Sequence, residues 1–259
     1  MKFILSILIL LLAANTIIAQ PYNQTDSNGK KIGKWEKKYD NGKTRYKGQF
    51  ENDYEVGEFF FYYPNGNIKS KLVYSEKGKL CKVSLFNKTG NVEAKGYYYD
   101  RKKHRTWRYY SASTGNTLKK EVYNKGIKDG KWITYYPNEQ IATEITWVNG
   151  KREGEWKEYF ENGRLKLSAT FVNDKLDGDY ESYYLNGQVS RKGKYVNGVS
   201  DGNWVVYNEA GVYTAAEKWN MGKLELERKF KNGKMYWEMD NINHKVTDLR
   251  EKKDGEEEQ

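Results

Sequence analysis

The residue types that most often carry enzymatic or metal chemistry are scarce in this 259-residue chain. It contains two histidines, His104 and His244, and a single cysteine, Cys81. Two histidines are too few for a histidine-based metal site, and one cysteine cannot form an internal disulfide. We therefore expect no catalytic residue, no metal site and no cofactor, and we expect the protein not to be an enzyme.

The carboxylates form no recognisable catalytic or calcium-binding pattern. Asp174, Asp177 and Asp179 lie close to a turn, where short carboxylates hydrogen-bond to the turn backbone. The fixed ligand spacing and closing glutamate of an EF-hand are absent. We interpret these aspartates as turn residues.

The chemistry that the sequence offers in quantity is binding through tyrosine and lysine. Aromatic residues make up 15% of the chain, with 23 Tyr and 8 Trp, and the net charge of +10 favours an acidic partner. Aromatic side chains with a polar tip are favoured at interfaces. Seven aromatic residues recur at a nearly constant spacing, namely Tyr62, Phe86, Tyr110, Tyr135, Tyr159, Tyr183 and Tyr207. Four lysines recur with them: Lys47, Lys71, Lys95 and Lys120. These are the candidate partner-binding residues.

The spacing of the candidates comes from a 24-residue repeat that is clearest between Gly154 and Asp174. If Gly154 is position zero, a Trp follows at plus two, a Tyr and a second aromatic at plus five and plus six, Asn-Gly at plus eight and plus nine, and an aromatic at plus seventeen. Position zero recurs at Gly33, Gly57, Cys81, Arg105, Gly130, Gly154, Gly178 and Gly202. The plus-two residues are Trp35, Phe59, Val83, Trp107, Trp132, Trp156, Tyr180 and Trp204. The chain therefore contains eight copies, with one single-residue slip after Arg105.

Each copy is predicted to be a β-hairpin. Asn-Gly between two extended runs is typical of a two-residue type I′ turn, in which both central residues have positive φ. Residues whose positions sum to seventeen then face each other across the hairpin. Copies three and four, from Cys81 to Asn124, are the least regular, and we expect a bulge or bend there.

Side-chain alternation assigns the rows of the repeat to two faces. The plus-two, plus-six, plus-eleven and plus-seventeen rows share one face, which we expect to be the packed face. The zero glycine should lie beneath the plus-seventeen ring, so that Gly154→Val would displace Phe171. The other face carries the plus-five aromatics and the plus-fourteen lysines. Two interpretations of that stripe stay open: solvated side chains that pack across strands, or a partner-binding surface.

The ends of the chain differ from the array. Residues 1–19 have a positive Lys2, a short apolar run and a small residue, Ala19, which is typical of a signal peptide. We expect a linker at 20–28, the repeat array with a closing hairpin at 29–239, and a charged, disordered tail at 240–259. The protein is therefore expected to be exported, either to the periplasm or out of the cell.

The unit Gly-x-Trp-x-x-Tyr-Tyr-x-Asn-Gly, with a second Asn-Gly at Asn149-Gly150 and Asn197-Gly198, resembles the bacterial variant of the MORN repeat. The resemblance covers most of the chain after the leader. It implies an all-β fold, an elongated antiparallel sheet of tandem 24-residue β-hairpin repeats. Exported chains of this kind often carry the label of YwqK-type antitoxin, and eukaryotic members usually act as protein-binding scaffolds.

These observations lead to two functional expectations. The first is an exported, non-enzymatic scaffold for a protein partner in the cell envelope, with toxin neutralisation implied only by the family label. The second is a binder of an acidic polymer or an anionic lipid surface, which would use the Tyr and Lys stripe many times along the array. No nucleic-acid partner is expected.

Overall fold

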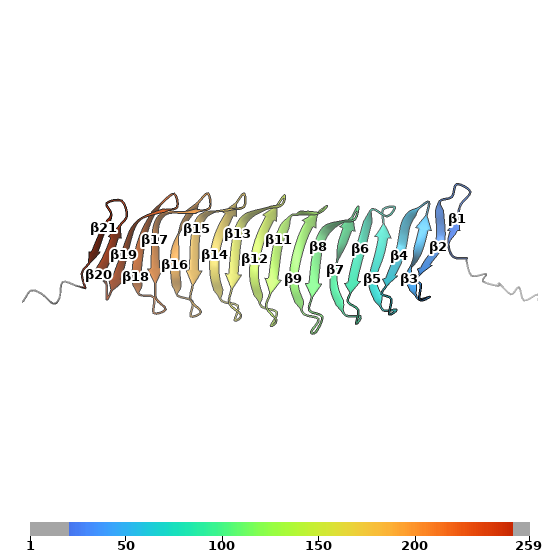
Figure 1. Ribbon diagram of the computed structural model, residues 1–259, viewed down its shortest axis with the longest axis horizontal. Helices are drawn as coiled ribbons and strands as arrows, with labels where there is room; N and C mark the ends of the chain where they lie inside the picture. The colour runs from blue at the N-terminus through green and yellow to red at the C-terminus, as the bar shows by residue number, and fades with distance from the viewer. Residues whose placement is uncertain (1–20, 251–259) are drawn as a thin grey trace, which may run out of the picture.

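The computed structural model describes residues 21–250, which form strands and turns without any helix. The predicted signal peptide and residues 251–259 lie outside this range. The strands follow one another in chain order and pair antiparallel with their neighbours to form one open sheet of 21 strands, in which β10 and β11 both pair with β9. Figure 1 shows this single row of strands, which extends from β1 at one end to β21 at the other. The prediction of an elongated antiparallel all-β array is confirmed.

The first eleven strands are β1 Gln24–Thr25, β2 Lys31–Lys38, β3 Thr44–Glu51, β4 Tyr54–Tyr62, β5 Ile68–Ser75, β6 Leu80–Phe86, β7 Val92–Tyr99, β8 Lys102–Tyr110, β9 Thr117–Asn124, β10 Ile127–Lys128 and β11 Gly130–Tyr135. The remaining strands are β12 Ile141–Val148, β13 Lys151–Tyr159, β14 Leu165–Val172, β15 Lys175–Tyr183, β16 Val189–Val196, β17 Val199–Tyr207, β18 Tyr213–Asn220, β19 Lys223–Lys231, β20 Lys234–Asp240 and β21 Lys245–Asp248. Within residues 21–250 no helix could cross a membrane.

The Asn-Gly turn inside each repeat differs from the predicted type. In β13 and β14, Trp156 pairs with Ala169 as the sum of seventeen requires, but Tyr159 pairs with Leu165 after a shift of register. The Gly163 amide donates to the Phe160 carbonyl, and of Asn162 and Gly163 only the glycine has positive φ. This is a three-residue loop with a glycine bulge, so the predicted two-residue type I′ turn was wrong.

The two-residue turns lie instead at the opposite edge, where one repeat joins the next. Val172 pairs with Lys175, and the two residues between them, Asn173 and Asp174, have φ of 48° and 69°. Positive φ at both central residues defines a type I′ turn. The second Asn-Gly of the repeat, for example Asn149-Gly150, takes this conformation too.

The zero glycine introduces a bulge between repeats. Across β12 and β13, Ile145 pairs with Trp156 whereas Trp147 pairs with Arg152, so the register shifts around Gly154. Gly154 has φ of +81°, and a Cβ added there would meet nothing within 4 Å. Its role is therefore to allow a left-handed backbone. The prediction that it lies beneath the ring of Phe171 was wrong.

The irregular third copy differs from the others in lacking this bulge. Around Cys81, strands β5 and β6 pair without any shift of register, whereas β7 and β8 shift register between Lys95 and Tyr97, around Arg105. The bulge predicted for copies three and four is therefore present in the fourth copy and absent around Cys81. The extra residue of the fourth copy enters its turn, where the Gly115 amide donates to the Ser111 carbonyl four residues earlier. The slip therefore lengthens a loop and leaves the strands in phase.

The core of the protein is a row of aromatic rings on one face of the sheet, which we call the aromatic ladder. Its members are Trp35, Phe50, Phe59, Tyr74, Tyr98, Trp107, Tyr123, Trp132, Trp147, Trp156, Phe171, Tyr180, Tyr195 and Trp204, which are the plus-two residues except Val83 and the plus-seventeen residues except Trp219. Some neighbouring rings meet edge to face, for example Phe50 and Phe59 with centroids 5.2 Å apart, and others are tilted, for example Trp132 and Trp147 at 47°. Trp204 and Trp107 are 0% and 1% exposed. The predicted packing of these two rows on one face is confirmed.

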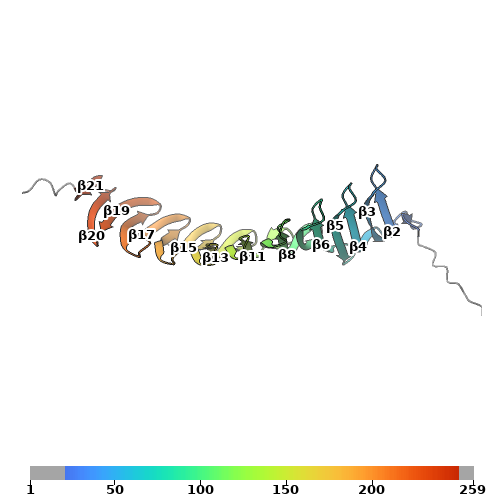
Figure 2. The ribbon, with the colours of Figure 1, turned by 90° about the horizontal axis from the view of Figure 1, so that it is seen from below.

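The rings at plus two lie over glycines of the preceding repeat. A Cβ added to Gly48, Gly96 or Gly193 would fall less than 3.0 Å from the ring of Phe59, Trp107 or Trp204. Figure 2 shows a single layer of curved strands along the whole array. Contacts between adjacent strands, rather than a second layer, therefore bury the large side chains of the described residues.

Tyrosines at plus six tie each turn to the next. The Tyr136 hydroxyl donates to the Tyr159 carbonyl at 2.8 Å, and the Tyr184 hydroxyl donates in the same way to Tyr207. The amide of Asn138 donates to the Glu161 carbonyl of the following turn. These hydrogen bonds recur along one edge of the sheet and couple consecutive repeats, a role that the sequence did not reveal.

Tyr136→Phe is expected to lower the free energy of unfolding by about 0.5–1.5 kcal/mol, the usual net value of one hydrogen bond. Copy six already has Phe160 at this position, so the site accepts a phenylalanine ring. The converse change, Phe160→Tyr, should add a hydroxyl within reach of the Tyr183 carbonyl and raise stability. Urea unfolding measures both. If both variants changed the free energy of unfolding in the same direction and by the same amount, the hydroxyl at plus six would not couple consecutive repeats.

Both ends of the array extend beyond the predicted limits. The closing hairpin is present as β19 and β20, joined by Asn232-Gly233. β21 then pairs with β20, so residues 245–248 of the predicted disordered tail form a strand, and that part of the prediction was wrong. At the other end, β1 lies within the predicted linker and pairs with β2.

Candidate functional site

The face opposite the aromatic ladder, which we call the polar face, carries the candidate residues. The seven plus-five aromatics are all half-buried, whereas Lys47 and Lys95 are exposed and Lys71 and Lys120 are half-buried. Both rows follow the array from one repeat to the next because alternate residues of a strand point to the same face. The polar face is therefore a long, shallow surface and not a closed site.

The structure brings lysines and aromatic rings together in the first half of the array. The ammonium of Lys47 lies 5.8 Å from the ring centroid of Tyr62 in the next repeat, and that of Lys95 lies 5.7 Å from Tyr110. Phe60, which the sequence did not single out, lies within 5.7 Å of Lys47 and 5.3 Å of Lys71. Such cation–π contacts hold the lysine side chains over the sheet. We call Lys47, Phe60, Tyr62, Lys71, Lys95 and Tyr110 the Lys/Tyr strip.

The other candidates do not extend the strip. In residues 21–250, Lys71 makes no comparable contact with Phe86, and Lys120 makes none with Tyr135. Farther along, the Tyr159 hydroxyl donates to Glu144 at 3.1 Å, and the Tyr183 hydroxyl donates to Glu181. Burial and then the Glu181 carboxylate raise the pKa of Tyr183 to about 12. Two tyrosines in the second half of the predicted stripe, Tyr159 and Tyr183, are therefore held in intramolecular hydrogen bonds.

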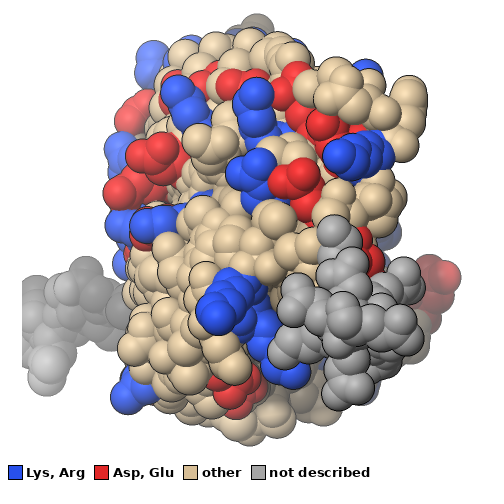
Figure 3. Space-filling model, turned by 90° about the vertical axis from the view of Figure 1, so that its left-hand side faces the viewer, with Lys and Arg blue, Asp and Glu red and all other residues tan. Residues whose placement is uncertain are grey.

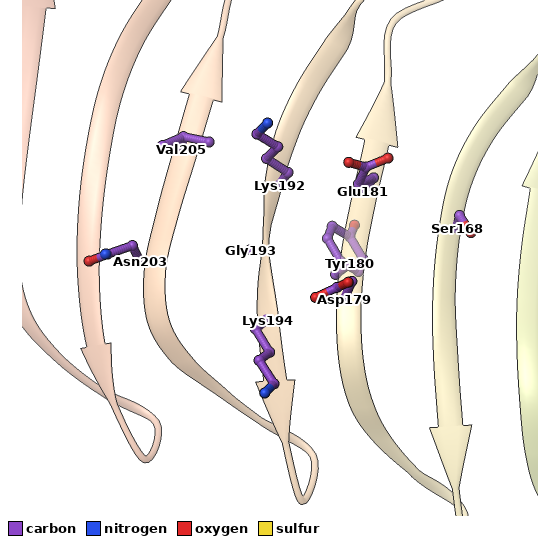
Figure 4. Close-up of a pocket in the computed structure, with 9 residues that line it drawn as sticks. All are labelled: Ser168, Asp179, Tyr180, Glu181, Lys192, Gly193, Lys194, Asn203 and Val205. Carbon is purple, nitrogen blue, oxygen red and sulfur yellow. The ribbon is translucent and has the colours of Figure 1, made fainter.

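The polar face is hollowed over the plus-fifteen glycine in two of the copies. Figure 4 shows the hollow over Gly193, of about 560 Å³, between Asp179 and Glu181 of β15 and Lys192 and Lys194 of β16. A similar hollow of about 350 Å³ lies over Gly48 in the first repeat. Both are open depressions at the same position of the repeat. Their shape suits an extended partner more than an enclosed small molecule.

Charges of both signs also reach the end of the array. Figure 3, an end-on view from the side of β20 and β21, shows Lys and Arg next to Asp and Glu. Several of these make ion pairs, such as Arg228 with Glu238 at 2.6 Å. By contrast, Lys47, Lys95 and Lys120 make no ion pair within residues 21–250. Lys192 and Lys194 of the seventh repeat make none there either, so unpaired lysines lie on the polar face in the first four repeats and again at the hollow over Gly193.

The aromatic ladder has its own cations, which the sequence reasoning missed. Lys128 lies 3.9 Å from the ring centroid of Trp147, and the guanidinium of Arg152 lies 4.2 Å from that of Phe171. Both residues occur two positions before the zero position. The same position holds Lys31, Lys79 and Lys103 in other copies. Aligning the copies at this position would have revealed the row.

The described residues provide no geometry for catalysis by the histidine or the thiol. Cys81 is 2% exposed, and burial raises its pKa to about 11, so the thiol is protonated at neutral pH. His104 accepts a hydrogen bond from the Lys125 amide at a turn, and burial followed by the charge of Arg105 lowers its pKa. No group of three His, Cys, Asp or Glu side chains in residues 21–250 is placed to hold a metal ion.

An open array of β-hairpin repeats with aromatic residues at fixed positions defines a repeat scaffold. Five segments of the chain match the family model described as MORN repeat variant, at residues 31–52, 55–76, 128–149, 152–173 and 176–197. The chain therefore contains five MORN repeat variants, which together cover 110 of its 259 residues. The copies that begin at Cys81, Arg105 and Gly202 are not matched, although the structure forms hairpins there as well.

Other comparisons add little. No curated protein matches the chain. The crystal structure of TarM shares 13% identity over 51% of this chain and 21% of that chain, with a TM-score of 0.22. The crystal structure of TcdB2-TccC3-TEV shares 12% identity over 85% of this chain and 13% of that chain, with a TM-score of 0.20. This chain therefore spans about a fifth or less of the length of either structure.

Proposed function

We propose that the protein is an exported, non-enzymatic scaffold that binds an acidic protein partner in the cell envelope through the Lys/Tyr strip. The observation that carries the proposal is the combination of half-exposed rings with lysines such as Lys47 and Lys95, which have no carboxylate partner in residues 21–250. Aromatic and cationic side chains together provide apolar contact area and attraction for carboxylates. Repetition along the array lets one partner use several equivalent contacts.

Export is part of the proposal and depends on the apolar run at the start of the chain. Removal of residues 1–19 would place the mature protein in the periplasm or outside the cell. Neutralisation of a toxin is supported only by the label that similar exported chains carry. It would require that the acidic partner be the toxin itself.

An acidic polymer or an anionic lipid surface is the alternative ligand. The observation that favours it is the run of lysine at plus fourteen in the first four copies, which ends at Glu144 in the fifth and recurs only as Lys192 in the seventh. A uniform anionic surface would use such a basic end without specific side-chain contacts. Binding to it would weaken steeply with salt, because it depends mainly on charge.

The triple change Lys47→Gln, Lys95→Gln and Lys120→Gln is expected to weaken binding of the partner at least ~10-fold at low salt, or about 1.4 kcal/mol. The reason is the loss of three cations that have no intramolecular carboxylate partner. The partner would be recovered from envelope extract by crosslinking, purified and titrated calorimetrically. Circular dichroism would verify that the variant is folded.

The matched control replaces Lys131, Lys157 and Lys218 with Gln, which removes the same charge from the second half of the array at lysines that already have carboxylate partners. Its effect on affinity is expected to be less than ~3-fold. Equal losses in the two triple variants would indicate attraction by net charge alone. If vesicles containing phosphatidylglycerol, or polyglutamate, bound as tightly as the purified protein, the alternative would replace the proposal.

A further inference from the structure

The third repeat is the only copy without an aromatic ring at plus two. In the second repeat, the ring of Phe59 fits between Phe50 and Tyr74, with centroids 5.2 and 5.3 Å away. In the fifth repeat, Trp132 occupies the same place between two rings of the ladder. The third repeat has Val83 instead, so the space between Tyr74 and Tyr98 has no ring of its own.

That space is partly filled from the preceding strand. Leu72 stands at the position where Gly48, Gly96 and Gly193 lie beneath a ring in other copies. It pairs directly with Val83, and Val83 is only 1% exposed. The exchange of a glycine and a ring for a leucine and a valine keeps the backbone covered. The leucine and the valine do not fill the space farther from the backbone that a ring occupies in the other repeats.

The result is an apolar hollow of about 380 Å³ on the face of the aromatic ladder, which we call the copy-three hollow. Its walls are Phe61, Leu72, Tyr74 and Tyr98, and Cys81 also lines it. These residues come from four consecutive strands, β4 to β7. No other hollow described above combines apolar walls of this kind with a position on the aromatic ladder.

The rim of the copy-three hollow is charged. Glu55, Lys79 and Arg101 line it, and the two cations are exposed. None of the three makes an ion pair within residues 21–250. Two cations and one carboxylate leave the rim with an excess positive charge, which complements a negative group on a ligand.

We propose that the copy-three hollow binds an aromatic side chain of a protein partner, with a carboxylate of that partner against Lys79 and Arg101. The other repeats fill the equivalent space with a ring of the chain itself, so a ring is the group that fits between the two tyrosines. Rings meet tyrosine edges favourably and bury a large apolar area. The inference depends on the proposed function, since it adds an anchoring site to the protein-binding scaffold.

The single cysteine allows a test that needs no partner. Cys81 of the full-length protein would be labelled with benzyl methanethiosulfonate and with methyl methanethiosulfonate. Each rate would be divided by the rate of the same reagent with N-acetylcysteine at the same pH. Either reagent transfers its alkylthio group to the Cys81 thiolate, forms a mixed disulfide and releases methanesulfinate. Because burial of the thiol slows both reagents, the ratio of the normalised rates reports on the ring of the transferred benzylthio group. We expect the benzyl reagent to be favoured at least ~10-fold. Equal normalised rates, or no reaction with either reagent, would overturn the proposal.

Competing ligands test the rim. Phenylacetate should slow benzyl labelling of Cys81, and acetate should not, because it lacks the ring. Arg101→Gln changes an exposed side chain and should raise the phenylacetate concentration needed for protection at least ~3-fold, while leaving protection by benzyl alcohol unchanged. If phenylacetate and benzylammonium protected equally well, the assigned carboxylate contact would be wrong.

The double variant Leu72→Gly with Val83→Trp restores the glycine and ring of the other repeats. It should place a ring of the chain in the hollow and remove the preference for the benzyl reagent. Lys131→Gln, distant from the hollow, should retain it. If the double variant does not fold, the competition experiment on the unchanged chain still tests the proposal.

The two proposals can fail separately. Suppose that the triple variant Lys47→Gln, Lys95→Gln and Lys120→Gln loses partner binding but Cys81 shows no ring preference. That result would remove this inference and leave the proposed function standing. A ring preference without any protein partner would remove the proposed function and the protein partner assigned to the hollow, and would leave only the preference of the hollow for a ring.

Discussion

Trp204→Ala is expected to lower the free energy of unfolding by about 3–5 kcal/mol, as large aromatic truncations in cores do. Trp204 is 0% exposed and contacts Tyr195 and Tyr180 with centroids 5.1 and 5.5 Å away. The guanidinium of Arg191 lies 4.5 Å from its ring and would lose that contact. Urea unfolding followed by circular dichroism measures the change.

The loss should also be local, because each repeat contacts only its neighbours and stability is approximately a sum over repeats and their interfaces. Hydrogen exchange should accelerate in β16 to β18 and stay unchanged in β2 to β5. Trp35→Ala is the control: Trp35 is half-buried near one end of the array, and its loss should cost less. Uniform acceleration along the chain would show that the array unfolds as one unit and would contradict the additive description.

The register of the hairpins could be predicted because it depends on one pairing rule and on side-chain alternation. Gly154 does pair with Phe171 and Trp156 with Ala169. The turn could not be predicted with the same certainty, because both possible loops need a glycine with positive φ. The two loops differ in the conformation of Asn162, which an Asn-Gly dipeptide does not reveal.

The function of the zero glycines depends on a relation between repeats. Reasoning within one hairpin identified the ring opposite Gly154 and assigned the glycine to that ring. The bulge at Gly154 instead involves β12 of the preceding repeat. Arg105 takes the same position with φ of 57°, so the backbone shape is kept even where the glycine is not.

The sequence predicted which rows of residues form the candidate surface. It did not predict which of their side chains stay available to a partner. Alternation along the strands was enough to place Lys47 and Tyr62 on one face, and the structure brings them together across two repeats. Whether a tyrosine hydroxyl stays available depends on nearby carboxylates. Tyr159 reaches Glu144 of the preceding repeat, a contact that spacing alone does not indicate.

Gly193→Ala is expected to lower the free energy of unfolding by about 1–3 kcal/mol, the range for overpacking. The added Cβ would fall less than 3.0 Å from three atoms of the Trp204 ring, and that ring is fully enclosed. Gly154→Ala is the matched comparison. It meets no atom within 4 Å, so its cost should come only from the φ of +81°, about 1–2 kcal/mol. Urea unfolding measures both losses of stability. Their expected ranges overlap, so their sizes alone do not distinguish overpacking from backbone strain.

A double-mutant cycle separates them. In a Trp204→Ala background the ring that meets the new Cβ is gone, so Gly193→Ala should become nearly neutral, and the two changes together should cost clearly less than their sum. Gly154→Ala should cost the same in both backgrounds, because backbone strain does not depend on a ring that it does not contact. Suppose instead that Gly193→Ala lowers the free energy of unfolding by the same amount with and without Trp204. The glycines at plus fifteen would then be needed for the backbone conformation. Packing of a ring on a bare glycine would not be what aligns one repeat with the next.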